Sequence, residues 1–123
     1  MRGQRTMEPI STALRQLRDE RGMTDTDVWA AAGISSAALS RYMHGTRGLL
    51  LDNRGARTVR RLAQVFEIDP EYFVEYRIWR LYRLARVDPR AALAAYEVAM
   101  ESARLRGSLV LIERLEADLD EEA

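Results

Sequence analysis

The 123-residue sequence contains no cysteine and no lysine, and His44 is its single histidine. Without thiols the chain can form neither disulfides nor thiolate metal sites, and one imidazole cannot build a multi-histidine site. A serine–histidine–aspartate triad would have to use His44, and nothing around it supports one. These absences predict a protein that is not an enzyme and holds no metal and no cofactor. The sequence neither supports nor excludes a small-molecule effector.

Long apolar runs and strand patterns are also missing. No run approaches the roughly 18 residues that a membrane span requires. The first ten residues have no apolar stretch of the kind found in secretory signals. Alternation of apolar and polar residues is too short for strands, and β-branched residues are sparse. We therefore expect an all-α, cytoplasmic protein that does not enter a membrane.

The formal net charge of zero conceals an asymmetry along the chain. Residues 1–61 contain eleven arginines and six acidic residues, which gives +5, whereas residues 62–123 contain eight and thirteen, which gives −5. The N-terminal half therefore suits a polyanion and the C-terminal half would repel one. Because every cation is an arginine, each can bind phosphate or guanine with two parallel hydrogen bonds.

Apolar spacing and capping signals predict helices along the whole chain. Gly22, Gly33 and Gly45 each follow an apolar-periodic segment and predict helix C-termini. Asp69 and Asp88 each precede a proline, the signal of an N-cap followed by the first helical residue. The acidic end, residues 118–122, is expected to fray. The predicted helices are 9–21, 24–32, 35–44, 57–66, 70–86, 89–106 and 109–119.

Residues 24–45, TDTDVWAAAGISSAALSRYMHG, have the pattern of a helix-turn-helix. A short helix with a capping box at Thr24 and Asp27 leads into a three-residue turn. Gly33 can take the left-handed conformation that the turn needs, and Ile34 would fill the corner between the helices. The residues expected to reach the core are Val28, Ala32, Leu39 and Met43.

Five short motifs follow one another within residues 10–73. They are 14–18 (LRQLR), 21–24 (RGMT), 32–35 (AGIS), 39–41 (LSR) and 62–73, which begins LA and ends FEIDPEYF. Together they resemble the phage-repressor or XRE family of DNA-binding domains. The resemblance implies a compact five-helix domain whose third helix enters the major groove. We expect a repressor-type helix-turn-helix domain at residues 9–74, followed by a helical self-association segment at 75–123.

The start of the third helix is where the resemblance implies base contacts, at Ser36 and Ala37, with Arg41 one turn further. Because Leu39 and Met43 face inward, these residues and their neighbours share the exposed face. Arg41 alone can read guanine bidentately, which contributes about 1–3 kcal/mol of discrimination; alternatively it binds only phosphate. The predicted DNA-binding residues are Ser35, Ser36, Ala37, Ser40, Arg41, His44, Arg47, Arg54 and Arg57.

The segment after this helix, residues 46–56, is about five residues longer than the resemblance implies. It carries Arg47 and Arg54, and Arg57 opens the next predicted helix. One interpretation is a basic flap that contacts the DNA backbone or minor groove. The other is a solvated loop whose three leucines, residues 49–51, pack back on the domain. His44 is either a pH-sensitive phosphate contact or a helix-end bystander.

Three residues depart from the pattern that the resemblance implies. Asp25 stands where the family often has a glutamine that bonds phosphate, and a carboxylate there would repel phosphate. Trp29 stands where a small residue is usual, so its ring must turn into the core or alter the helix crossing. Met43 replaces a glutamate that often pairs with the residue at Arg18. Arg18 therefore needs another partner.

The C-terminal half carries helix faces that need cover. Residues 72–87 place Val74, Ile78, Leu81 and Ala85 on one face, with a second band of aromatic residues beside it. The interleaved arginines suit a structural role, in which their stems cover apolar surface. The last helix offers a narrow apolar seam. The predicted dimerisation residues are Ile78, Leu81, Tyr82, Leu109, Ile112 and Leu115.

The sequence thus predicts a homodimeric transcriptional regulator that binds double-stranded DNA with modest specificity. Repressor-type domains commonly act as two-fold dimers on paired half-sites. A nucleoid-associated protein of low specificity is a close alternative. A protein-interaction adaptor that keeps the fold without binding DNA is an alternative from a different class, favoured by Asp25 and by the extensive apolar helix surface.

Overall fold

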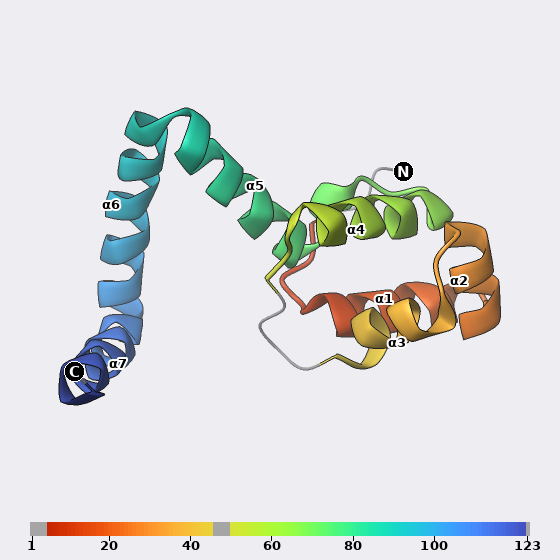
Figure 1. Cartoon of the computed structure of the whole chain (residues 1–123), viewed down its shortest axis with the longest axis horizontal. Helices are drawn as coiled ribbons and strands as arrows, with labels where there is room; N and C mark the ends of the chain where they lie inside the picture. The colour runs from red at the N-terminus through yellow and green to blue at the C-terminus, as the bar shows by residue number, and fades with distance from the viewer. Residues whose placement is uncertain (1–4, 46–49, 123) are drawn as a thin grey trace. The chain divides into compact units, whose positions relative to one another are not determined.

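The computed structural model describes residues 5–45 and 50–122, apart from the side chains of residues 120–122 (Figure 1). All regular secondary structure in these residues is helical, which confirms the all-α prediction. The chain forms two compact units, divided between Tyr82 and Arg83. The helices are α1 (Ile10–Glu20), α2 (Asp25–Ala32), α3 (Ser36–His44), α4 (Asn53–Val65), the 3₁₀ turn η1 (Pro70–Tyr72), α5 (Val74–Val87), α6 (Pro89–Arg106) and α7 (Ser108–Glu122).

The first unit is built around one apolar core. Helix α1 packs against α3, α2 packs against α3 and α4, and α4 packs against η1. In Figure 1, α1 and α3 form one side of this unit, α4 forms the other, and α2 closes one end. The apolar residues of α1 and α4 both face this core. Its largest fully buried side chains are Phe66, Phe73, Leu14, Leu39, Met43, Leu62, Val28 and Val59.

The helix-turn-helix forms where the sequence predicted it, because its signals are local. Thr24 Oγ1 accepts the backbone N–H of Asp27 (3.1 Å), and the Asp27 carboxylate accepts that of Thr24 (2.9 Å), which completes the capping box. Gly33 has φ +70°, the left-handed conformation that the turn requires. Ser35 caps α3 by accepting the N–H of Ala38 (3.0 Å).

The fourth helix begins four residues before the predicted residue 57, so the predicted loop to residue 56 was too long. Asp52 is its N-cap and accepts the N–H of Gly55 at 2.7 Å. A Cβ at Gly55 would lie 3.2 Å from the Asp52 carboxylate and 3.2 Å from the Tyr42 hydroxyl. Gly55 therefore serves close packing in the first helical turn, and Arg54 belongs to α4 rather than to a loop.

Two other predicted helix bounds were wrong. Asp69 caps only the short turn η1, and Phe73 is extended before α5 begins at Val74. That break lets the fully buried Phe73 ring enter the core. The last helix continues to Glu122 rather than ending at residue 119, and it includes the acidic end.

Helix α5 is fixed to the first unit through its N-terminal turns. Glu75 is buried, and both of its carboxylate oxygens accept the N–H of Ile10 at 3.1 Å. Tyr76 is a core residue, and its ring lies 5.3 Å from that of Trp79. Arg80 pairs with Glu71. These contacts support the structural interpretation of the α5 arginines, and the core of the first unit includes residues beyond 74.

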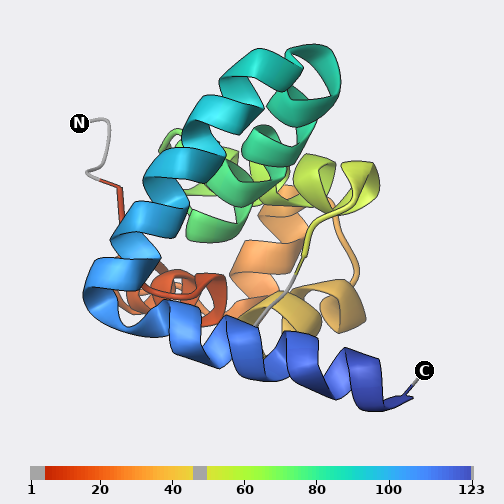
Figure 2. The same ribbon diagram turned by 90° about the vertical axis from the view of Figure 1, so that its left-hand side faces the viewer.

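The second unit contains no comparable core. Helices α6 and α7 contact each other near Gly107, which has φ +76°, and α7 turns away from α6 there (Figure 2). No described side chain in residues 83–119 is buried. Apolar side chains as large as Tyr96 and Leu105 are therefore more than half exposed.

Candidate nucleic-acid interface

The exposed face of α3 is the one that the sequence predicted. Leu39, Tyr42 and Met43 are buried, and they orient the remaining side chains outward. Small residues at the start of the helix leave its backbone accessible to a groove. The exposed residues are Ser36, Ala37, Ser40, Arg41 and His44, preceded by the exposed N-cap Ser35.

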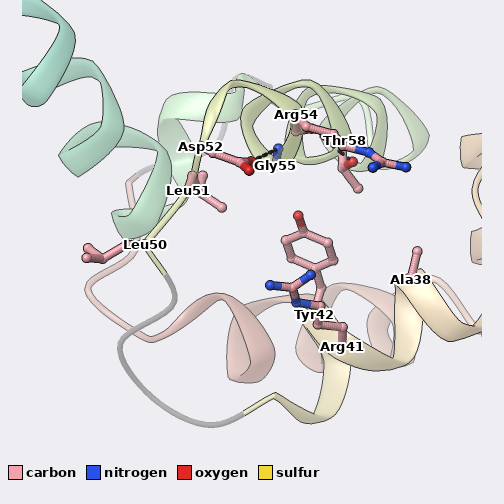
Figure 3. A pocket seen from close by; sticks show the side chains of 9 residues that line it. All are labelled: Ala38, Arg41, Tyr42, Leu50, Leu51, Asp52, Arg54, Gly55 and Thr58. Atoms are coloured by element: carbon pink, nitrogen blue, oxygen red, sulfur yellow. Dashed lines mark hydrogen bonds between the residues drawn. The ribbon is translucent and has the colours of Figure 1, made fainter.

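A cavity of about 380 Å³ lies between α3 and the first turns of α4 (Figure 3). Arg41 lines it from α3, and Arg54 and Thr58 line it from α4. The Tyr42 hydroxyl points from α3 toward α4. Burial raises the pKa of Tyr42, and a hydrogen bond with Thr58 offsets part of that shift. Two guanidinium groups therefore flank a cavity whose wall holds an un-ionised phenol at neutral pH.

Helix α4 carries a row of arginines on its solvent side. Arg54 and Arg57 are exposed and share that side with Arg61, four residues after Arg57. None of the three forms an ion pair with any described residue, and the same is true of Arg41. Arg61 was missed in the sequence-based prediction, although its spacing from Arg57 was the available signal. The predicted Arg47 lies outside the described residues.

Asp25, one of the three departures from the family pattern, is the partner of Arg18, which lost its usual partner through a second departure, Met43. Arg18 Nη1 donates to Asp25 Oδ1 at 2.7 Å, and its Nε donates to Asp19 Oδ1 at 2.9 Å. The hydrogen bond with Asp25, followed by that with Asp19, raises the pKa of Arg18. His44 Nε2 lies 3.9 Å from the other Asp25 oxygen. Asp25 thus joins α1 to α2 and approaches the end of α3.

The remaining departure, Trp29, is accommodated by the core. Its side chain is partly buried and packs against the core cluster, as does Ile34 at the corner of the turn. The backbone carbonyl of Trp29 accepts the N–H of Ile34 at 3.1 Å. The Trp29 ring therefore packs toward the core, while its backbone carbonyl still accepts the hydrogen bond that closes the turn.

The predicted dimerisation residues fall in both units. Ile78, Leu81 and Tyr82 of α5 are exposed, as are Ile112 and Leu115 of α7. Leu109 is partly buried beside the junction with α6. Their exposure leaves these side chains available for a partner, and their role in dimerisation stays a prediction.

A capped helix, a left-handed glycine turn and a second helix with an exposed polar face define the helix-turn-helix class. The family model described as a helix-turn-helix domain matches residues 10–72, and the chain belongs to this family. No curated protein and no solved structure gives a significant match. Across the described residues, no helix combines the length and apolarity needed to cross a membrane.

Proposed function

We propose that the protein is a transcriptional regulator of the phage-repressor or XRE type, which binds double-stranded DNA as a homodimer with modest sequence specificity. The observation that supports this most is the exposed face of α3, which presents Arg41 beside the arginines of α4. In this proposal the DNA-binding part is residues 9–74, and residues 75–123 provide self-association. Its action is binding at the nucleoid in the cytoplasm rather than catalysis.

Phosphate contacts in this proposal come mainly from α4. Arg54, Arg57 and Arg61 are exposed cations without ion-pair partners among the described residues, so they bind phosphate without first breaking another bond. Helix N-termini often bind phosphate, but Asp25 occupies the first turn of α2 and is held there by Arg18. A carboxylate at that point repels phosphate. The backbone anchor is therefore displaced from α2 to α4.

Base recognition in this proposal is limited by the residues on α3. Ser36 and Ser40 can bond base edges or phosphate with little preference, and Ala37 can contact a thymine methyl group. Arg41 is the only side chain on this face that can bind guanine bidentately. Specificity therefore rests on one strong contact, supplemented by the shape of the DNA.

The test is fluorescence anisotropy with genomic fragments from around the protein's own gene and with random duplexes, at two salt concentrations. Arg41→Ala should weaken binding to the preferred fragment by about 10- to 100-fold and reduce the preference itself. Arg57→Ala should weaken binding to all duplexes alike and lower the salt slope by about one. Arg90→Ala, which removes the same charge from exposed α6, is the matched control and should have little effect.

Three other results would redirect the assignment. Equal affinity for all duplexes, unchanged in preference by Arg41→Ala, would indicate a nucleoid-associated protein of low specificity. No binding at either salt concentration would overturn DNA binding and leave the adaptor alternative. Binding that does not weaken with salt would contradict the phosphate contacts assigned to α4, because phosphate neutralisation releases counterions.

A further inference from the structure

Helix α7 carries an apolar stripe that nothing in the described chain covers. Leu111, Ile112, Leu115 and Leu119 have spacings that place them on one side of the helix. Their exposed fractions are 60%, 41%, 65% and 66%. An apolar stripe this exposed, on a helix without a core beneath it, is typical of a surface that binds another helix.

The charges around α7 are reversed relative to its own dipole. The first turn of α7 contains no acidic residue, and the last turn contains no basic one. Arg104 and Arg106, in the last turn of α6, precede the N-terminus of α7. Arg104 already pairs with Glu101, so Arg106 is the cation left for a partner. Acidic residues 118 and 120–122 lie at the C-terminus of α7. Helices are stabilised by acids at the N-terminus and by bases at the C-terminus, so this arrangement is unfavourable within one helix.

A second copy of α7 running in the opposite direction resolves both features. We infer that α7 associates with the partner's α7 in antiparallel orientation, with Leu115 at the centre and Leu111 opposite the partner's Leu119. The acidic end of each helix then lies beside the arginines and positive N-terminus of the other. Parallel pairing would place the two acidic ends together. This inference rests on the homodimer of the proposed function and adds the surface and its orientation.

The absence of cysteine from the chain makes disulfide trapping a clean test. Leu115→Cys lies at the centre and should cross-link to itself in an antiparallel pair. Leu111→Cys and Leu119→Cys should not, because each thiol would lie about 12 Å along the axis from its counterpart. A mixture of these two variants, allowed to exchange subunits before oxidation, should give the mixed disulfide. Sedimentation of the unmodified protein measures the dimer independently.

The other possible results of these experiments would each overturn the inference in a distinguishable way. Efficient self-cross-linking of both Leu111→Cys and Leu119→Cys would show parallel pairing and overturn the inference, while the homodimer would stand. A dimer in sedimentation without any α7 cross-link would place the interface elsewhere and overturn it too. A monomer at all concentrations would remove the homodimer itself, and DNA binding would be judged separately by anisotropy. The fluorescence of Trp29 and Trp79 reports whether each variant keeps the first unit folded, and circular dichroism reports whether the helices of the second unit are retained.

Reversing the charge of one arginine tests whether unlike helix ends lie together, and reversing a second arginine serves as the control. Arg106→Glu should raise the dimer dissociation constant by about three- to tenfold at low salt, with the difference shrinking as salt screens it. Arg90→Glu changes the net charge equally at the far end of α6 and should leave self-association unchanged. Equal effects of the two variants would contradict the pairing of unlike ends.

Discussion

The two units of the chain are both helical but are stabilised differently. Every buried side chain among the described residues belongs to the first unit, whereas α6 and α7 of the second unit bury none. Capping and helix propensity suffice to define α6, which has Asp88 as N-cap and Gly107 as C-cap. Isolated helices are marginal in water, and burial of an apolar face supplies most of their stability. The first unit therefore has its own apolar core, whereas the described helices of the second unit lack one.

The largest expected difference comes from deleting a core side chain. Phe66 is fully buried, so Phe66→Ala should destabilise the first unit by about 3–5 kcal/mol through lost burial and the cavity left behind. Leu93→Ala on α6 removes a side chain that is 63% exposed and should change the stability by less than about 0.5 kcal/mol. Urea unfolding followed by tryptophan fluorescence measures the first unit, and circular dichroism measures both.

Similar losses of stability for Phe66→Ala and Leu93→Ala would contradict the difference in burial between the two units. A large loss for Leu93→Ala at dilute protein concentration would mean that the second unit buries α6 within a single chain. A loss that appears only at high concentration would instead place Leu93 in a contact between copies.

The features that the sequence predicted correctly depend on neighbouring residues. Thr24, Asp27, Gly33 and Ser35 act within one or two turns, so the helix-turn-helix could be placed from its capping and turn chemistry. The exposed face of α3 could then be predicted as well, because burying Leu39 fixes which other residues of a regular helix face outward.

The features that were missed depend on distant residues. The break before α5 exists because the core accepts Phe73, and a side chain at Gly55 would crowd the Tyr42 hydroxyl of another helix. The partner of Arg18 is set by where the chain places α2 after α1, which no capping or periodicity pattern contains. The start of α4 is an exception, because its signal, the Asp52 N-cap, is local and was overlooked, so the arginine row on that helix was only partly recognised.

Removing one helix cap from each unit should give a smaller difference in stability, which is specific to the unit that carries the cap. Thr24→Ala removes the acceptor for the Asp27 N–H and should cost the first unit about 1 kcal/mol. Asp88→Ala removes the corresponding acceptor for the Ala91 N–H, but it should fray only the start of α6. Thermal unfolding of the first unit, followed by fluorescence, should shift for Thr24→Ala and not for Asp88→Ala. A shift for both would mean that the two units unfold together.

The same cap predicts a pH dependence. The backbone hydrogen bond from Thr24, aided by its hydroxyl, lowers the pKa of Asp27. A carboxylate whose pKa is lower in the folded state stabilises that state above its unfolded pKa of about 4, and the contribution is lost as the pH falls further. Asp27→Asn should therefore flatten the acid limb of the stability profile. An unchanged acid limb would assign that limb to other carboxylates.

The smallest expected difference is between the coupling free energies of two ion pairs of similar chemistry. Arg18–Asp25 joins α1 to α2, and Arg18 is largely covered, whereas Arg104–Glu101 lies within exposed α6. A double-mutant cycle with Arg18→Ala and Asp25→Ala should give a coupling free energy of about 0.5–1 kcal/mol, because the pair fixes two packed helices. The cycle for Arg104 and Glu101 should give a coupling free energy of about 0.3 kcal/mol or less, which should vanish at high salt.

Asp25→Ala should also strengthen DNA binding slightly, because it removes a negative charge beside α3. Weaker DNA binding would instead show that Asp25 holds α2 in the position that α3 requires, and the ion pair would then belong to the interface as well as to the fold.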